Sequence, residues 1–246
     1  MNRELQEKST TPGERLFLDI SSVKTTSIGG AKFWLLVQDD ATDMCWSFFL
    51  KKKSDLAQSV LTLIINLRLQ HSIKVQHIRC DNAGENLSLR KRCDNGGLGI
   101  NFEFTAVRTP EQNGRVERLY QTLYGRVRAT LRGAGIGAKY RQKLWAECAA
   151  TITKTYVVTV KREGEKPPYL RFYGKLPPYV HHLRRFGEVG VVTKFGGGEI
   201  KGKLADRGEI KVFVGYADNH AGDVYRMLNP STGCISETRV KLSPLT

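Results

Sequence analysis

Three apolar stretches near the start of the chain, RLFLDISSV (15–23), KFWLLVQDD (32–40) and MCWSFFLKK (44–52), decide the fold. Each has the length and the aromatic and β-branched content of a strand. The pair Gly29-Gly30 marks a turn after the first stretch, and Asp40–Asp43 marks a turn after the second. Because tight turns join them, the pattern predicts an antiparallel meander of three strands.

The segments after the meander alternate between helix and strand patterns. LAQSVLTLIINLRLQH (56–71) has apolar residues at helical spacing. Further helices are expected over 86–92, within 109–131 and over 139–158, and short strands over 74–80 and 100–105. This order of three strands, helix, strand, short strand and two helices predicts an α/β layer structure with a mixed sheet.

The composition changes after Val160. Residues 161–185 contain two Pro-Pro pairs and are expected to form an extended connector. Residues 186–246 contain five short strand patterns, one of them over 200–204, which predicts a small barrel or sandwich. The predicted organisation is a polar tail (1–13), an α/β core (14–160), the connector and a small all-β C-terminal domain.

The charge of the chain points to acidic partners. The 246 residues carry a formal net charge of +15, which favours nucleic acid first and an anionic membrane surface second. No apolar run approaches the length of a membrane span, and the polar N-terminal segment lacks the apolar stretch of a secretion signal. The five cysteines form no CxxC pair, which indicates reduced thiols in an intracellular protein and argues against zinc.

Three acids stand out by their positions. Asp19 lies inside the first predicted strand, Asp81 at the end of the fourth, and Glu117 in the first turns of a helix. Strand ends and adjoining helix starts share one edge of an α/β sheet, so the three carboxylates could together hold hard divalent cations. Each acid also has a structural explanation: a backbone-bonded strand residue, a plain turn, and an acid favoured by the helix dipole. The pair Asp39-Asp40 competes as a ligand pair, although a turn explains it without metal.

The sequence around these acids carries a resemblance. LDIS (18–21), IRCDNAGEN (78–86) and TPEQNGRVER (109–118), with 35 residues between Asp81 and Glu117, resemble the catalytic core of retroelement integrases. Residues 32–55, 186–192 and 202–240 are similar to blocks of copia-type retrotransposon integrases within Pol polyproteins. The resemblance covers nearly the whole chain from Pro12 onward.

The resemblance implies an RNase H-like core with two Mg²⁺ ions, for which Mn²⁺ can substitute, at Asp19, Asp81 and Glu117. It implies 3′-end processing of element DNA and strand transfer into target DNA, by a homo-oligomer in the nucleus or in a cytoplasmic particle. Family members usually carry an upstream zinc module that nothing before Pro12 could form. We therefore expect an incomplete integrase, a fragment of a longer polyprotein or a decayed copy. Glu111 stands where the family more often has glutamine.

DNA contacts are expected beside the acids. The expected contact residues are Asn82, Asn113, Gln121, Tyr124 and Arg128. Helical spacing puts the last three on the face of Glu117, while Leu119, Leu123, Val127 and Leu131 pack on the core. A solvated helix face, and a turn role for Asn113, are the competing interpretations. Two other functions stay open: an inactive or domesticated nucleic-acid-binding remnant, and an RNase H-like nuclease that only hydrolyses.

Overall fold

The meander forms as predicted and becomes part of a five-stranded mixed sheet. The computed structural model describes residues 8–105, 114–193, 207–218 and 220–240. The strands are β1 (Arg15–Ser22), β2 (Phe33–Asp39), β3 (Cys45–Leu50), β4 (His77–Cys80) and β5 (Asn101–Phe104). Their order in the sheet is β3-β2-β1-β4-β5, with β2 antiparallel to β1 and β3, and with β4 parallel to β1 and β5.

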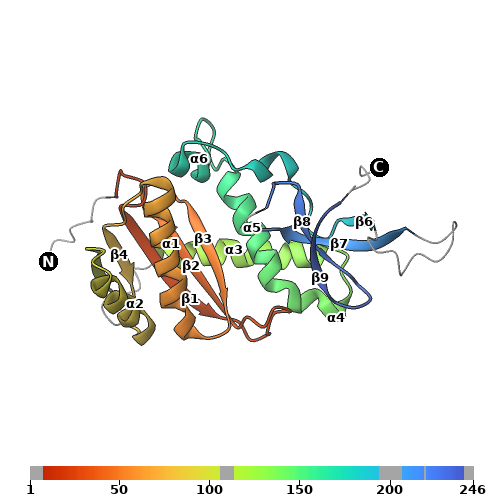
Figure 1. The fold of residues 1–246 in the computed structure, drawn as a ribbon, viewed down its shortest axis with the longest axis horizontal. Coiled ribbons are helices and arrows are strands. Elements are labelled where there is room, and N and C mark those ends of the chain that lie inside the picture. Colours follow the sequence, from red (N-terminus) through yellow and green to blue (C-terminus); the bar gives the residue numbers. More distant parts are fainter. Residues whose placement is uncertain (1–7, 106–113, 194–206, 219, 241–246) are drawn as a thin grey trace.

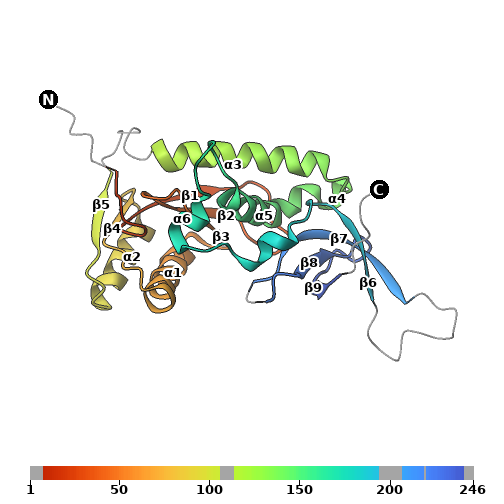
Figure 2. The same cartoon turned by 90° about the horizontal axis from the view of Figure 1, so that it is seen from above.

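Helices cover both faces of this sheet. α1 (Leu56–His71) and α2 (Gly84–Asn95) lie on one side, and α3 (Gly114–Gly133) crosses the other side (Figures 1 and 2). α5 (Trp145–Val158) packs against α3 and β3. This double cover explains why β2 is almost continuously apolar, with Trp34, Leu35 and Leu36 fully buried. No helix within the described residues combines the length and the apolarity needed to span a membrane.

The single helix predicted over 139–158 is interrupted. It divides into α4 (Ala138–Arg141), a 3-10 turn η3 (Gln142–Leu144) and α5. The backbone N–H of Ile28 donates a hydrogen bond of 2.7 Å to the carbonyl of Lys143. The prediction of one continuous α-helix was wrong at this 3-10 turn, where the Lys143 carbonyl accepts a hydrogen bond from outside the helix.

The connector is only partly extended. It contains the helix α6 (Pro168–Tyr173) and a 3-10 helix η4 (Pro178–His182). The second proline of each Pro-Pro pair begins a helix, a position where the missing N–H has no cost. Phe172 of α6 is buried, and its ring centroid lies 5.0 Å from that of Trp46. The expectation of an extended connector was therefore wrong over these two helical segments.

The C-terminal region is all-β, as predicted. β6 (Val189–Thr193), β7 (Gly208–Tyr216), β8 (Val224–Leu228) and β9 (Ile235–Arg239) form an antiparallel sheet in that order. The further strand predicted over 200–204 lies outside the described residues. β7 packs on α5, and Val214 and Leu228 belong to the same buried apolar cluster as the central sheet. The small all-β region is thus joined to the core by packing as well as by the connector.

Candidate active site

The parallel pairing of β1 with β4 brings two of the three acids to one edge. The register runs from Arg15 opposite His77 to Phe17 opposite Arg79. Two positions further along the two segments are Asp19 and Asp81. Asp19 is half-buried within β1, whereas Asp81 directly follows β4 and is exposed.

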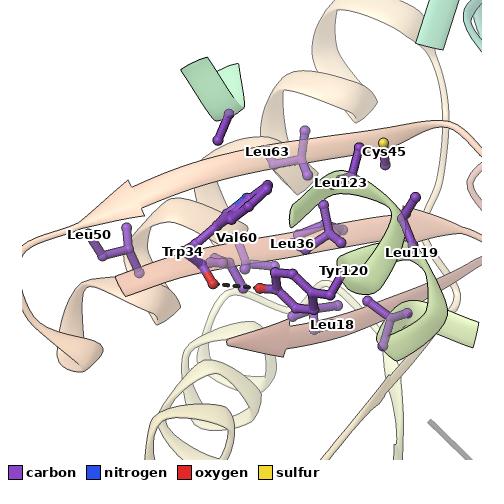
Figure 3. Packing of buried hydrophobic residues seen from close by; sticks show 14 of the residues in the cluster. Leu18, Trp34, Leu36, Cys45, Leu50, Val60, Leu63, Leu119, Tyr120 and Leu123 are labelled. Carbon is purple, nitrogen blue, oxygen red and sulfur yellow. Dashed lines mark hydrogen bonds between the residues drawn. The ribbon is translucent and has the colours of Figure 1, made fainter. Parts of the chain in front are cut away.

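Helix α3 brings the third acid over the same strand. Glu117 lies in its first turn and is exposed, and Tyr120 follows three residues later on the buried side. The Tyr120 hydroxyl donates to the carbonyl of Asp19 at 2.9 Å and also bonds the carbonyl of Trp34. Figure 3 shows the Tyr120–Trp34 bond, with Leu119 and Leu123 of the same helix above Leu18 and Leu36. The apolar face of α3 therefore fixes the helix on the sheet with Glu117 near Asp19.

The charges of Asp81 and Glu117 both act on the carboxyl of Asp19. The pKa of Asp19 rises from 3.8 to about 6, first because the carboxyl is withdrawn from water and then because the charges of Asp81 and Glu117 oppose its ionisation. The backbone N–H of Ile20 donates to Asp19 Oδ1 at 2.8 Å and partly offsets this rise. A cation beside Asp19 would offset the opposition of these two charges.

The carboxylates are nevertheless not gathered into a finished metal site. In the described part of the chain, no group of three His, Cys, Asp or Glu side chains is arranged so that it could hold a metal ion. The donor chemistry fits Mg²⁺ or Mn²⁺, since all three side chains offer hard oxygen ligands. Bringing these oxygens to one ion would require side-chain movement, for which the exposed Asp81 and Glu117 have room.

The competing pair Asp39-Asp40 has a structural role. Asp39 is fully buried and accepts hydrogen bonds from the backbone N–H of Gly13, at 2.7 Å, and from both the N–H and the hydroxyl of Thr42. Asp40 forms ion pairs with Arg15 and Arg115. The turn explanation for this pair is confirmed, because the described contacts of both carboxylates are to groups that hold the fold.

The predicted DNA-contact residues fall into three groups. Asn82 is exposed beside Asp81, and Gln121 and Arg128 are exposed on α3. Tyr124 is half-buried: its hydroxyl bonds Ser21 Oγ at 3.0 Å, and its ring packs 4.8 Å from that of Trp34. Asn113 lies outside the described residues. The face of Gln121 and Arg128 is therefore open, whereas Tyr124 is largely committed to internal contacts.

Two residues that matter for this geometry were not singled out from the sequence. Tyr120 ties α3 to Asp19 through its hydroxyl. The sequence shows that Tyr120 lies one helical turn after Glu117, but it does not show that the hydroxyl is buried and hydrogen-bonded. Asn86 Nδ2 donates to Asp81 Oδ1 at 2.6 Å. An asparagine in a polar helix gives no signal of burial, so the sequence pattern did not mark it.

The mixed sheet and the helices that cover its two faces give the chain an RNase H-like fold. Comparison with known proteins confirms the resemblance to the Pol polyproteins of retrotransposons, although no protein-family model matches the chain. The chain is similar to the retrovirus-related Pol polyprotein from transposon TNT 1-94 of Nicotiana tabacum, at 29% identity over 214 residues. A similar match, at 25% identity over 179 residues, is to the retrovirus-related Pol polyprotein from transposon RE1 of Arabidopsis thaliana.

These matches cover much of this chain but little of the relatives. They span 83% and 73% of the chain, and only 15% and 12% of the two polyproteins. Among solved structures, the fold is similar to a chain in the cryo-EM structure of the simian T-cell lymphotropic virus intasome in complex with PP2A regulatory subunit B56 gamma. That match has a TM-score of 0.52 and 15% identity, and covers 96% of this chain and 79% of that chain. It confirms the predicted fold class.

Proposed function

We propose that the chain is the integrase part of a retrotransposon polyprotein and performs metal-dependent 3′-end processing and strand transfer of element DNA. The observation that carries the proposal is the placement of the acids: the register of β1 against β4 puts Asp19 and Asp81 at one edge of the sheet, and Tyr120 ties α3, which carries Glu117, to Asp19. Structural ion-pair networks also perturb pKa values. Here, however, the charges of Asp81 and Glu117 both oppose the ionisation of Asp19, and no described ion pair joins Asp19, Asp81 or Glu117 to a cation.

The proposed role of the three acids is to hold metal ions. Asp19, Asp81 and Glu117 would hold two divalent cations, which supply activation of the attacking hydroxyl and stabilisation of the leaving oxygen in an in-line displacement. The attacking group is a water or a DNA 3′-hydroxyl, so no protein nucleophile is needed. Cys80, next to Asp81, fits this proposal, because burial raises the pKa of its thiol to about 12 and leaves no thiolate at neutral pH.

The proposed partners are the two ends of the element DNA, the target DNA and further copies of the chain. The net charge of +15 suits a polyanion, and Gln121 and Arg128 offer an exposed polar and basic face beside Glu117. The structural relative is part of an intasome. Phosphate contacts of this kind would make DNA binding weaken steeply as salt is added.

A product analysis separates this function from the two alternatives. The protein would be incubated with Mg²⁺ or Mn²⁺ and labelled element-end DNA, and the products resolved by length. Joined products are expected. Cut products without joining would favour a nuclease that only hydrolyses, and salt-sensitive binding without any product would favour an inactive remnant.

A further inference from the structure

Asn86 is an unusual residue for its location. It lies in the first turn of α2 and is only 3% exposed. Its amide Nδ2 donates to Asp81 Oδ1 at 2.6 Å and to the Asp81 carbonyl at 3.2 Å. One side chain therefore holds both the carboxylate and the backbone of a candidate metal ligand.

The surroundings satisfy only one end of the Asn86 amide. The Oδ1 atom of Asn86 is buried and has no hydrogen-bond partner within the described residues. The other buried residues of α2 are Leu89 and Cys93, which belong to the apolar cluster. A leucine, which has nearly the same shape, would remove the unsatisfied oxygen, but it would also remove both hydrogen bonds to Asp81.

The contacts of Asp81 show what the amide does. Asp81 is exposed at the end of β4, where its side chain could occupy several rotamers. Oδ1 accepts from Asn86 and, at 3.3 Å, from the backbone N–H of Ala83. These two donors fix the rotation of the carboxylate, and Oδ2 receives no described hydrogen bond.

We infer that Asn86 is a positioning residue that orients the Asp81 carboxylate for cation binding. The inference rests on the proposed function, because it assigns Asn86 a role toward a ligand of the proposed site. Outer-shell partners of this kind typically contribute tenfold or more to metal affinity.

The test is Mn²⁺ binding to the full chain, followed by the electron paramagnetic resonance signal of free Mn²⁺. Asn86→Leu and Asn86→Ala both remove the donor, and the second keeps the test valid if leucine prevents folding. Ser88→Ala, at an exposed position of the same helix, is the matched control. We expect both Asn86 variants to stay folded at the assay temperature while their Mn²⁺ affinity falls about tenfold. Ser88→Ala should bind as wild type.

Asp81→Asn, measured in parallel, distinguishes a failure of the Asn86 inference from a failure of the proposed function. If Asp81→Asn abolishes binding while both Asn86 variants bind Mn²⁺ as wild type, the inference is overturned and the proposed function stands. A loss of affinity that tracks a loss of Tm in both Asn86 variants would assign Asn86 a structural role and also overturn it. Wild-type protein that binds no Mn²⁺, or Asp81→Asn protein that binds normally, would contradict the proposed function itself.

Discussion

Asp19 shows the conflict between stability and function at the scale of one residue. It sits in a strand whose preceding residues Leu16 and Leu18 are buried, and its carboxyl is itself half-buried. Burial and two neighbouring acids raise its pKa to about 6. At neutral pH the folded protein therefore holds a charge that the unfolded chain would hold at lower cost.

This conflict predicts that Asp19→Asn stabilises the protein at neutral pH. The folded pKa of about 6 exceeds the ordinary value of 3.8, so ionised Asp19 lowers the free energy of unfolding above pH 6. The asparagine variant should gain roughly 1–2 kcal/mol at pH 7.5, and the gain should shrink as the pH falls through 6 toward 4. Urea unfolding in the presence of a chelator measures it.

Asp94→Asn, at an exposed site, is the control and should change stability by less than about 0.5 kcal/mol. A variant at Asp19 that is less stable than wild type at pH 7.5 would contradict this account of the residue.

At the residue scale, the sequence singled out three acids but did not show what surrounds them. Asp19 and Asp39 are both acids within apolar strands. Only the fold shows that Asp39 is satisfied by Gly13 and Thr42, whereas Asp19 faces two other acids. The distinction depends on neighbours that are distant in the chain, so local pattern could not supply it.

Helix α3 is the element on which the candidate site depends. Its first turn is held where Arg115 bonds the carboxylates of Asp40 and Asp43 from the β2–β3 turn. Tyr120 and Tyr124 then tie its middle to β1 through Asp19 and Ser21. The helix is thus anchored on both sides of Glu117 in sequence, which leaves its outer face for a ligand.

Because Arg128 is exposed on the outer face of α3, we predict that it contacts the phosphate backbone of DNA. Arg128→Ala should weaken DNA binding to a similar extent for all sequences and reduce the slope of log affinity against log salt by about one, because one phosphate contact is lost. Fluorescence anisotropy of a labelled duplex over a range of salt concentrations measures both effects.

Arg90→Ala provides a matched loss of charge, since Arg90 is exposed on α2, on the opposite side of the sheet. Equal losses of DNA affinity for Arg128→Ala and Arg90→Ala would show that Arg128 acts only through the net charge of the protein. That result would contradict the assignment of the outer face of α3 to DNA contact.

The elements were predictable where a single periodicity governs them. The apolar positions of α3 predicted its buried face correctly, with Leu119, Leu123 and Val127 buried and Leu131 half-buried. α6 was missed, since a Pro-Pro pair is compatible with both an extended chain and a helix start. Its Phe172 packs on Trp46, a contact that favours the helix and that no local pattern contains.

The whole molecule is held together by α5. This helix packs on β3 and α3 on one side and on β7 on the other. Thr151 Oγ1 lies 3.4 Å from the carbonyl of Val214, and Glu147 faces Arg226 at 3.6 Å. Two sheets therefore share one helix, and the C-terminal sheet should unfold together with the core.

Leu228→Ala tests this coupling. Leu228 is 1% exposed in β8, and its truncation should cost roughly 2–4 kcal/mol. None of the three tryptophans lies in the C-terminal sheet, so tryptophan fluorescence follows the unfolding of the central sheet and its helices. We expect the urea midpoint followed by fluorescence to fall in the variant.

Ile210→Ala, at a position 63% exposed in β7, should leave the midpoint nearly unchanged. If the fluorescence midpoint also stays unchanged for Leu228→Ala, the C-terminal sheet unfolds as an independent unit. That result would contradict the claim that the two sheets share one core.

At the scale of the whole molecule, sequence patterns predicted the two parts and their order. They did not predict how the parts pack, because the contact between α5 and β7 joins segments that each have an ordinary amphipathic pattern. The predicted boundaries at 13, 160 and 185 stay predictions, and the described residues 8–13 already bond the core through Ser9 and Gly13.

The most direct test of the central claim is disintegration of a preassembled branched DNA by Glu117→Gln protein with Mn²⁺. This reaction requires little assembly, so it reports the chemistry of the three acids. We predict that Glu117→Gln lowers the rate by at least about a hundredfold while Tm is preserved, whereas Glu163→Gln, at an exposed connector site, reacts as wild type. Unchanged turnover by Glu117→Gln would contradict the assignment of the three acids as the catalytic site.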